Sequence, residues 1–306
     1  MKKTFYSNGK LLITGEYLVL DGAKAFALPT KFGQNLTIEE GSNQELVWTS
    51  YDVDGTIWFE DHISFLEITH PIANPIPSVK STLITILHEA YVMNPSFIST
   101  SNGYRITTKL TFPKKWGLGT SSTLINNIAQ WVQIDAFELL KTSFGGSGYD
   151  IACAQNDTPI TYQLVNGKPK VENVKFQPIF TDSIYFIYLN KKQNSKTAIA
   201  NYQRNKAANL ETSIVTINSL TAEILATTTL KHFTQALEKH EEEMSRILDS
   251  STVKENLFND FHGQIKSLGA WGGDFVMVVS EVNPTGYFNA KGYHTILTYN
   301  EMILQE

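Results

Sequence analysis

Residues 113–123, with the sequence PKKWGLGTSST, combine residue types that can bind a phosphate group. A strand-like run at residues 104–112 precedes them, and an apolar-periodic segment that starts near Ser121 follows, which predicts a strand-to-helix turn. Gly117 and Gly119 let a ligand approach the main chain and permit backbone angles closed to other residues. The hydroxyl and N–H groups that follow lie at the positive end of the predicted helix, where anions bind. The stretch therefore predicts a phosphate cradle.

The simpler interpretation of this stretch is a loop that ends in a serine N-cap. The stretch lacks the lysine that follows the last glycine of a Walker A loop, and it does not have the spacing GxGxxG. A nucleotide bound here would therefore be held differently from one in a P-loop or Rossmann protein.

The composition is that of an ordinary globular protein with a sizeable core. The chain has 306 residues, a length that is enough for two domains or one large domain. Of these residues, 42% are hydrophobic and 18% are charged. The formal net charge of -5 argues against a general nucleic-acid-binding protein, which needs a basic face. Cys153 is the single cysteine, which excludes an intrachain disulfide framework and a cysteine-rich metal site.

The N-terminal stretch does not have the pattern of a secretory signal peptide. Polar residues, including Glu16, interrupt its apolar part, and no run in the chain approaches the length of a membrane span. We therefore expect a cytoplasmic protein without a membrane or nucleic-acid partner. The expected partner is a small molecule, and the sequence is compatible with a monomer or a homodimer.

The first half of the chain reads mainly as strands. Strand patterns lie at residues 32–39, 45–49, 56–59, 159–165 and 168–174. The first three predict an antiparallel sheet, and the last two flank Asn166 and Gly167, a strong signal for a type I′ hairpin. Apolar spacing over residues 79–93 predicts a helix.

The second half predicts a sheet backed by helices. Strands are expected at residues 183–189, 275–280 and 294–299, and helices at 198–209, 212–227, 231–248, around 253–267 and around 284–290. The charge run HEEEMSR in the third of these helices is most simply a solvated face. A boundary near residues 175–183 predicts two domains, at residues 1–178 and 179–306.

Glycine-rich stretches recur along the chain: GKLLITGEY near the start, GLGTSST and GGSGYDIA in the middle, and GAWGGD near the end. Together they resemble the GHMP kinase superfamily, in particular its mevalonate kinase and phosphomevalonate kinase branch and a subgroup with the string GYDIA. The resemblance follows the order and spacing of nearly the whole chain.

The resemblance implies an α+β fold class, a two-domain α/β sandwich of GHMP kinase architecture. Its N-terminal domain would be ribosomal-protein-like and its C-terminal domain ferredoxin-like. It further implies a phosphotransferase that uses ATP and Mg²⁺. The acceptor would be a small alcohol or phosphate of the mevalonate pathway of isoprenoid biosynthesis.

Position in the motifs makes Asp150 the counterpart of the family's catalytic carboxylate and Lys10 its partner. Lys10 would lower the pKa of the acceptor oxygen and offset charge as the γ-phosphoryl group moves. Asp150 would accept the proton of an alcohol, a task that shrinks if the acceptor is a phosphate monoester. On position alone, Asp150 is also a common helix-start residue that satisfies the helix dipole.

The resemblance also assigns the ATP and magnesium contacts. The phosphate-loop residues would be Gly117, Leu118, Gly119, Thr120, Ser121 and Ser122. Ser121 and Glu138 would ligate Mg²⁺, which prefers oxygen ligands. Thr120 replaces a family serine and keeps the hydroxyl group. The alternative for Glu138 is an exposed carboxylate at a helix end.

The expected acceptor contacts are Glu16, Ser147, Gly148, Lys196, Gly269 and Ala270. Glu16 corresponds to a family glutamate that would orient Lys10. The basic loop NKKQNSKTA resembles the family pattern only loosely, and its lysines either contact an anionic acceptor or are simply solvated.

The glycine stretch GAWGGD, residues 269–274, departs from the family pattern at Trp271 and Asp274. Trp271 would reshape the pocket, and Asp274 would add negative charge near the phosphates. The alternative is that Trp271 packs into the domain interface and Asp274 points away. Two rival functions therefore stay open, a diphosphomevalonate decarboxylase-like enzyme and a non-catalytic nucleotide- or metabolite-binding homologue.

Overall fold

The computed structural model describes residues 2–193 and 195–305, and its chain divides into two compact units. Unit 1 comprises Met1–Gly9, Phe32–Lys114 and Leu118–Gln155, and unit 2 comprises Lys10–Lys31, Lys115–Gly117 and Asn156–Glu306. The strands β1 (Lys3–Thr14) and β2 (Ala25–Glu40) contribute residues to both. Because the units interleave in the sequence, they do not test the predicted domain limits, which stay a prediction.

Unit 1 is built on a mixed sheet with the strand order β4-β3-β5-β2. Its other strands are β3 (Glu45–Tyr51), β4 (Ile57–Ser64) and β5 (Tyr104–Leu110). The antiparallel pairing predicted for this region holds for β3 with β4, but β5 lies between β2 and β3 and pairs with β3 in parallel. The helices between β4 and β5 provide the crossover that parallel strands require.

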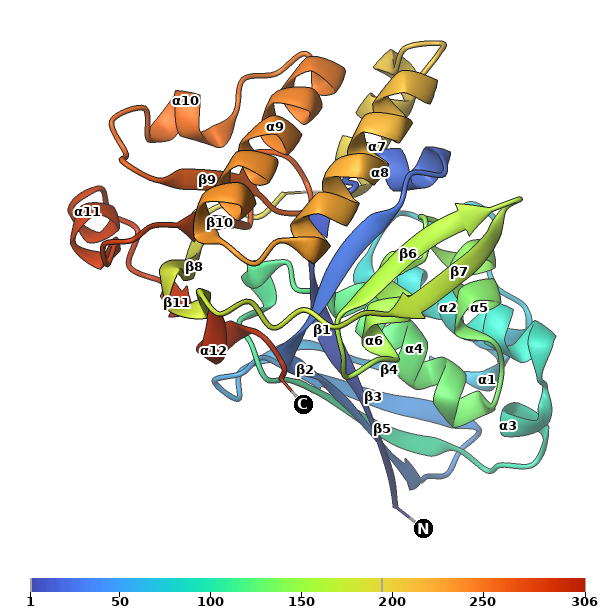
Figure 1. Cartoon of the computed structure of the whole chain (residues 1–306). Coiled ribbons are helices and arrows are strands. Elements are labelled where there is room, and N and C mark those ends of the chain that lie inside the picture. Colours follow the sequence, from blue (N-terminus) through green and yellow to red (C-terminus); the bar gives the residue numbers. More distant parts are fainter. Residues whose placement is uncertain (1, 194, 306) are drawn as a thin grey trace. The chain divides into compact units, whose positions relative to one another are not determined.

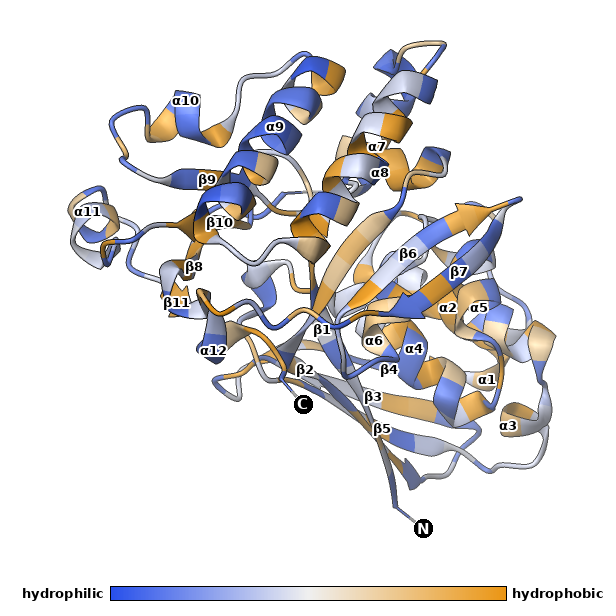
Figure 2. Ribbon diagram, in the orientation of Figure 1, coloured by the Kyte–Doolittle hydropathy of each residue, from blue (hydrophilic) through white to orange (hydrophobic). Residues whose placement is uncertain are grey.

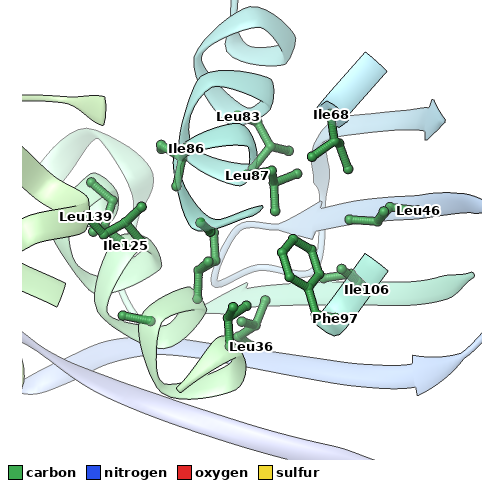
Figure 3. Close-up of a cluster of buried hydrophobic side chains, with 14 of the residues drawn as sticks. Leu36, Leu46, Ile68, Leu83, Ile86, Leu87, Phe97, Ile106, Ile125 and Leu139 are labelled. Atoms are coloured by element: carbon green, nitrogen blue, oxygen red, sulfur yellow. The ribbon is translucent and has the colours of Figure 1, made fainter. Parts of the chain in front are cut away.

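Helices cover one face of this sheet (Figure 1). They are α1 (Phe65–Thr69), α2 (Val79–Met93), α3 (Ser96–Ser99), α4 (Thr120–Val132), α5 (Ala136–Ser143) and α6 (Tyr149–Ala154). Figure 3 shows how Leu83 and Leu87 of α2 lie near Leu46 of β3 and Ile106 of β5 in the buried core. Leucines spaced by four residues share one helix face, so this contact follows from the predicted helical spacing.

The apolar-periodic segment after the glycine turn forms two helices rather than one. Gln133, with φ of 59°, ends α4 in the left-handed conformation, and the side chain of Asp135 then caps α5 by accepting from the N–H groups of Phe137 and Glu138. Apolar periodicity continues through the break because both helices bury residues in the same core.

Unit 2 contains a hairpin and a separate four-stranded sheet. The hairpin joins β6 (Ile160–Val165) to β7 (Lys168–Asn173), and β6 also pairs with β2. The turn residues Asn166 and Gly167 both have positive φ, of 52° and 73°, as the predicted type I′ turn requires.

The four-stranded sheet of unit 2 is antiparallel, with the order β11-β8-β10-β9. Its strands are β8 (Ile184–Tyr188), β9 (Gln264–Ser267), β10 (Phe275–Val279) and β11 (Ile296–Thr298). The accompanying helices are α7 (Ser195–Asn205), α8 (Glu211–Ala226), α9 (Leu230–Leu248), α10 (Val253–Leu257), α11 (Thr285–Ala290) and α12 (Tyr299–Met302), with a 3₁₀ turn at Leu18–Asp21. The helix expected around residues 253–267 is therefore wrong beyond Leu257, because β9 instead pairs with β10.

The helix α9 is largely hydrophilic with a narrow apolar stripe (Figure 2). Its buried residues include Phe233, Leu237 and Met244, but also His240 and Glu241. The prediction that HEEEMSR is a solvated face is thus wrong for His240 and Glu241. The sequence could not reveal this, because their buried partners come from distant segments.

No helix among residues 2–193 and 195–305 is long and apolar enough to cross a membrane.

The unit 1 core yields a stability prediction. Leu87→Ala should lower the free energy of unfolding by about 2–5 kcal/mol, because Leu87 is fully buried and its truncation leaves a cavity. Leu66→Ala is the matched control, since Leu66 is 68% exposed and should cost at most about 0.5 kcal/mol. Urea denaturation followed by circular dichroism measures both. Equal losses in the two variants would contradict the assigned core.

Candidate functional site

The start of α4 in unit 1 has the features of an anion-binding turn. Gly119, with φ of 101°, is the N-cap residue, and Gly117 just before it has φ of 71°. No side chain caps the helix start, and the first turn holds no acidic residue. The partial positive charge at the N-terminus of this 13-residue helix is therefore not neutralised by a carboxylate in its first turn.

The three hydroxyl groups after Gly119 have different roles. The Ser122 hydroxyl is used inside the helix start, where it donates to the Gly119 carbonyl oxygen at 2.9 Å. Ser121 is exposed, and the buried Thr120 hydroxyl has no hydrogen-bond partner among the described residues. Because a buried polar atom normally finds a partner, the Thr120 hydroxyl fits a phosphate oxygen or a water bound there. The turn thus fits a phosphate-bearing cofactor.

The loop before α6 forms a second glycine-rich helix start in the same unit. Gly148 is the N-cap residue with φ of 92°, and Ser147 and Asp150 are half-buried beside it. The helix α6 packs against α4, and Gln155 at its end donates a hydrogen bond to Asn126 of α4 at 3.0 Å. The turn that carries Asp150 is therefore fixed to the helix that begins at the predicted phosphate turn.

Glu138 lies in the first turn of α5 and is exposed. Its carboxylate lies 3.7 Å from the Lys141 ammonium group one turn later. This is the placement expected for a helix-end carboxylate, while its assignment as a magnesium ligand stays a prediction. The described residues contain no group of three or more His, Cys, Asp or Glu side chains that could hold a metal ion.

Lys10 lines a recess in unit 2. The recess is lined by Lys10, Leu11, Leu12, Trp116, Gly117, Leu268, Gly269, Asp274 and Phe275. The Lys10 ammonium group donates a hydrogen bond to the Gly117 carbonyl oxygen at 3.3 Å. The predicted residues Lys10, Gly117 and Gly269, from three distant segments, thus meet at one place.

Asp274 faces this recess, so the alternative that it points away is wrong. A Cβ atom on Gly117 would lie 2.4 Å from the Asp274 carboxyl carbon, which shows that the carboxylate packs directly on the glycine. Burial raises the pKa of Asp274, whereas the positive charge of Lys10 and a hydrogen bond from the Gln193 N–H lower it. The carboxylate therefore shares the recess with the ammonium group of Lys10.

Trp271 packs inside unit 2, against the cluster that contains Tyr17, Tyr202 and Met244. Its backbone N–H donates to the Tyr17 hydroxyl at 3.0 Å, and its indole N–H donates to the Ser251 carbonyl at 3.1 Å. It does not line the recess. A packing role for Trp271 is therefore confirmed, with its partners in unit 2. Its placement at an interface between the predicted domains stays a prediction.

Aromatic side chains hold the segment before Gly117 in place. The ring of Trp116 meets the ring of Phe275 edge-on, with centroids 5.4 Å apart, and Phe275 also contacts Tyr188. The Tyr188 hydroxyl donates to the Lys115 carbonyl at 3.1 Å. No local pattern in the sequence indicates this anchor, because Tyr188 of β8 and Phe275 of β10 are ordinary strand aromatics.

Asp52 and Trp58 of unit 1 anchor Lys114, the residue before Lys115. The Lys114 N–H donates to the Asp52 carboxylate at 3.0 Å, and its ammonium group lies 4.0 Å from the centre of the Trp58 ring. The predicted turn is thus anchored at residues that the sequence analysis did not single out.

Glu16 belongs to a buried cluster of charges in unit 2. One carboxylate oxygen of Glu16 pairs with the Lys266 ammonium group, which also lies 3.1 Å from Glu241. The second Glu16 oxygen lies 3.5 Å from Nε2 of His240, which accepts a hydrogen bond from the Gly15 N–H. These contacts do not test the predicted role of Glu16 in orienting Lys10.

The cluster holds two carboxylates and one ammonium group, so it is balanced when one carboxylate keeps a proton. Burial raises the pKa of Glu16 to about 7, against the attraction of Lys266. Burial and the Lys266 charge hold the pKa of His240 well below its usual value, so His240 is neutral. A proton on Glu16 lets its oxygen face the unprotonated His240 nitrogen without repulsion between lone pairs.

Two other predicted acceptor residues, Lys196 and Ala270, are not among the residues that line the recess. Lys196 is exposed in the first turn of α7, and Ala270 is half-buried next to Gly269. Their roles stay predictions.

Comparisons with known proteins support the fold. No protein-family model and no curated protein sequence matches the chain. A mevalonate kinase crystal structure is similar with a TM-score of 0.72 at 15% identity, covering 99% of this chain and 100% of that one. The mevalonate kinase of Methanococcus jannaschii is similar with a TM-score of 0.71 at 14% identity, covering 100% and 99%.

The phosphomevalonate kinase of Streptococcus pneumoniae, in complex with phosphomevalonate and AMPPNP, is also similar. Its TM-score is 0.68 at 14% identity, and the match covers 99% of this chain and 98% of that one. The chain therefore has the fold of these kinases over its full length. The predicted fold class is confirmed, and the resemblance to GHMP kinases is confirmed at the level of the fold.

The buried cluster predicts a pH dependence of stability. Between pH 4.5 and 7, folded Glu16 keeps a proton that unfolded Glu16 has lost, so a rise in pH favours unfolding. Relative to Glu16→Gln, which cannot titrate, the wild type should lose up to about 3 kcal/mol of stability across this window. Urea denaturation at a series of pH values measures the difference.

The control for this experiment is Glu223→Gln, a change at an exposed glutamate of α8. Its stability should differ from that of the wild type by no more than about 0.5 kcal/mol at every pH. A flat difference between wild type and Glu16→Gln would show that Glu16 does not hold the proton.

Proposed function

We propose that this chain, which has the fold of GHMP-type kinases over its full length, is an ATP- and Mg²⁺-dependent small-molecule kinase. It transfers the γ-phosphoryl group of ATP to a mevalonate-like or phosphomevalonate-like acceptor in the cytoplasm. The observation that carries the proposal is the start of α4, where left-handed glycines and the unpartnered Thr120 hydroxyl form an anion-binding turn. The second support is the GHMP-type kinase fold of the chain.

The proposed nucleotide site is the segment Gly117–Ser122. Backbone N–H groups at the start of α4 would bind phosphate oxygens, and the exposed hydroxyl of Ser121 would ligate Mg²⁺, with Glu138 as a second ligand. Bound Mg²⁺ neutralises charge on the transferring phosphoryl group.

Lys10 and Asp150 are the proposed catalytic residues. Lys10 would stabilise negative charge on the acceptor oxygen and the moving phosphoryl group. Asp150 would accept the proton of the acceptor hydroxyl. At the same time the acceptor oxygen would form the new bond to the γ-phosphorus, and ADP would leave. With a phosphate monoester acceptor, Asp150 would mainly orient the acceptor. The remaining proposed acceptor contacts are Glu16, Ser147, Gly148, Lys196, Gly269 and Ala270.

One observation favours a second candidate function, a non-catalytic nucleotide-binding or metabolite-binding homologue. The Asp274 carboxylate packs against Gly117 and would repel a phosphate placed there. A coupled assay of ADP release against small alcohols and phosphomonoesters, including mevalonate and phosphomevalonate, separates the two. ATP binding without acceptor-dependent ADP release would favour the non-catalytic homologue. ADP release with diphosphomevalonate together with CO₂ would indicate a decarboxylase.

Substitution of Asp150 tests the proposed catalytic role. Asp150→Asn should lower kcat by about 10²–10⁴-fold with an alcohol acceptor, because the amide cannot accept the proton. The KM for ATP should change by less than about 3-fold, since only the chemical step loses an interaction. Steady-state kinetics measures both constants. Asp135→Asn is the matched control, a helix-start aspartate of unit 1 whose capping role asparagine retains. An unchanged kcat in Asp150→Asn would eliminate this role.

A change at Gly117 tests the nucleotide turn. Gly117→Ala should raise the KM for ATP by at least about 10-fold, because the new Cβ atom collides with the Asp274 carboxylate and φ is left-handed. Gly145→Ala is the matched control, since Gly145 also has a left-handed φ, of 78°, but has no atom within 4 Å of a Cβ. Similar ATP constants for both variants would argue against a nucleotide turn at Gly117.

A further inference from the structure

The basic loop after β8 is joined to the glycine stretch GAWGGD by backbone hydrogen bonds. The Leu189 N–H donates to the Asp274 carbonyl at 2.8 Å, and the Asp274 N–H donates to the Lys191 carbonyl at 2.8 Å. Asp274 adopts a φ of 52°, in the left-handed region that aspartate tolerates better than most residues. Both segments lie in unit 2.

The side chains of Asp274 and Gln193 tighten this connection. The Gln193 N–H donates to the Asp274 carboxylate at 3.2 Å, and the Gln193 side-chain amide donates to the Trp271 carbonyl at 3.1 Å. A Cβ atom on Gly273 would lie 2.0 Å from Cγ of Gln193, so the Gln193 side chain rests directly on the glycine backbone. We call Gln193, Gly273 and Asp274 the interlock.

The interlock joins the basic loop to Asp274, which lines the recess. The Asp274 carboxylate packs on Gly117, whose carbonyl oxygen accepts from Lys10, and the positive charge of Lys192 also acts on this carboxylate. The positive charges of Lys10 in β1 and Lys192 in the basic loop thus both act on this carboxylate. This arrangement leaves a net positive charge for an anionic group of a ligand.

We propose that Asp274 and Gln193 are positioning residues that hold the basic loop, with Lys191 and Lys192, at the recess to bind an anionic group of the acceptor. The proposal rests on the proposed kinase function for its acceptor and on the unit 2 contacts for its geometry. Asp274 therefore acts through the loop, although its carboxylate packs on Gly117 of the proposed phosphate turn.

Trypsin cleavage after Lys191 and Lys192 tests the interlock without any enzymatic activity. A protease requires an extended, unpaired backbone, and the hydrogen bonds of Lys191 and Gln193 prevent this. Asp274→Gly removes the carboxylate that accepts the hydrogen bond from the Gln193 N–H, and glycine tolerates the left-handed φ at this position. Gln193→Ala removes the side-chain contacts with Gly273 and Trp271. Each should speed cleavage at these lysines at least about 5-fold in native buffer.

Two variants control the cleavage experiment. Asp274→Asn keeps a side-chain oxygen for the Gln193 N–H and should cleave within about 2-fold of the wild-type rate. Asp182→Gly, at an exposed aspartate of unit 2, should behave like the wild type. Thermal unfolding followed by circular dichroism identifies any variant that fails to fold. Wild-type cleavage rates in both Asp274→Gly and Gln193→Ala would overturn the interlock.

Kinetics with mevalonate and phosphomevalonate test the acceptor role. Asp274→Gly and Gln193→Ala should each raise the acceptor KM at least about 10-fold, and Gln193→Ala should leave the KM for ATP within about 2-fold. Asp274→Asn should stay within about 3-fold of the wild-type acceptor KM. The double variant should resemble the single variants, because both changes release the same loop.

The two experiments separate the possible failures. If the wild type turns over neither acceptor nor any other member of the panel, the proposed function fails, and cleavage rates still decide the interlock. If the wild type is active and both variants cleave faster with unchanged acceptor KM, the acceptor role is overturned. An increase for phosphomevalonate alone would assign the loop to the phosphate group, and an increase for both acceptors to the carboxylate.

Discussion

Unit 2 depends on one buried ammonium group, that of Lys266. It is shared by Glu16, which follows β1, and by Glu241 of α9, and all three side chains are almost completely buried. Removing one partner of such a group leaves an uncompensated buried charge, which is far more costly than losing an exposed pair. Because β1 carries Lys10 and β9 leads into Gly269, this one ammonium group holds together the strands that line the recess.

Unit 1 contains two helix starts that begin at left-handed glycines. Gly119 and Gly148 both cap their helices in the left-handed conformation, and neither helix start is closed by a capping side chain. The packing of α4 against α6 fixes one start to the other. A rigid core beneath them, formed by α2 and the mixed sheet, gives both turns a fixed support.

The surroundings of Asp274 in the structure change the interpretation of its negative charge. In the sequence it is a negative charge at an unfavourable place, whereas in the structure it accepts a hydrogen bond from the Gln193 N–H, and the positive charges of Lys10 and Lys192 lower its pKa. A carboxylate with these partners can organise positive charge at the site rather than cancel it. The sequence alone therefore suggests that Asp274 repels phosphates, whereas its contacts in the structure suggest that it organises positive charge.

The sequence by itself determined the local features: the hairpin at Asn166 and Gly167, the helix over α2 and the glycine turn before α4. These follow from backbone preferences and periodicity, which act between neighbours in the chain. Tertiary structure alone decided the burial of Glu241, the separation of β9 from α10 and the partners of Asp274. Each of these depends on residues far apart in the chain, such as Lys266 for Glu241, and no local pattern encodes which distant group a side chain will meet.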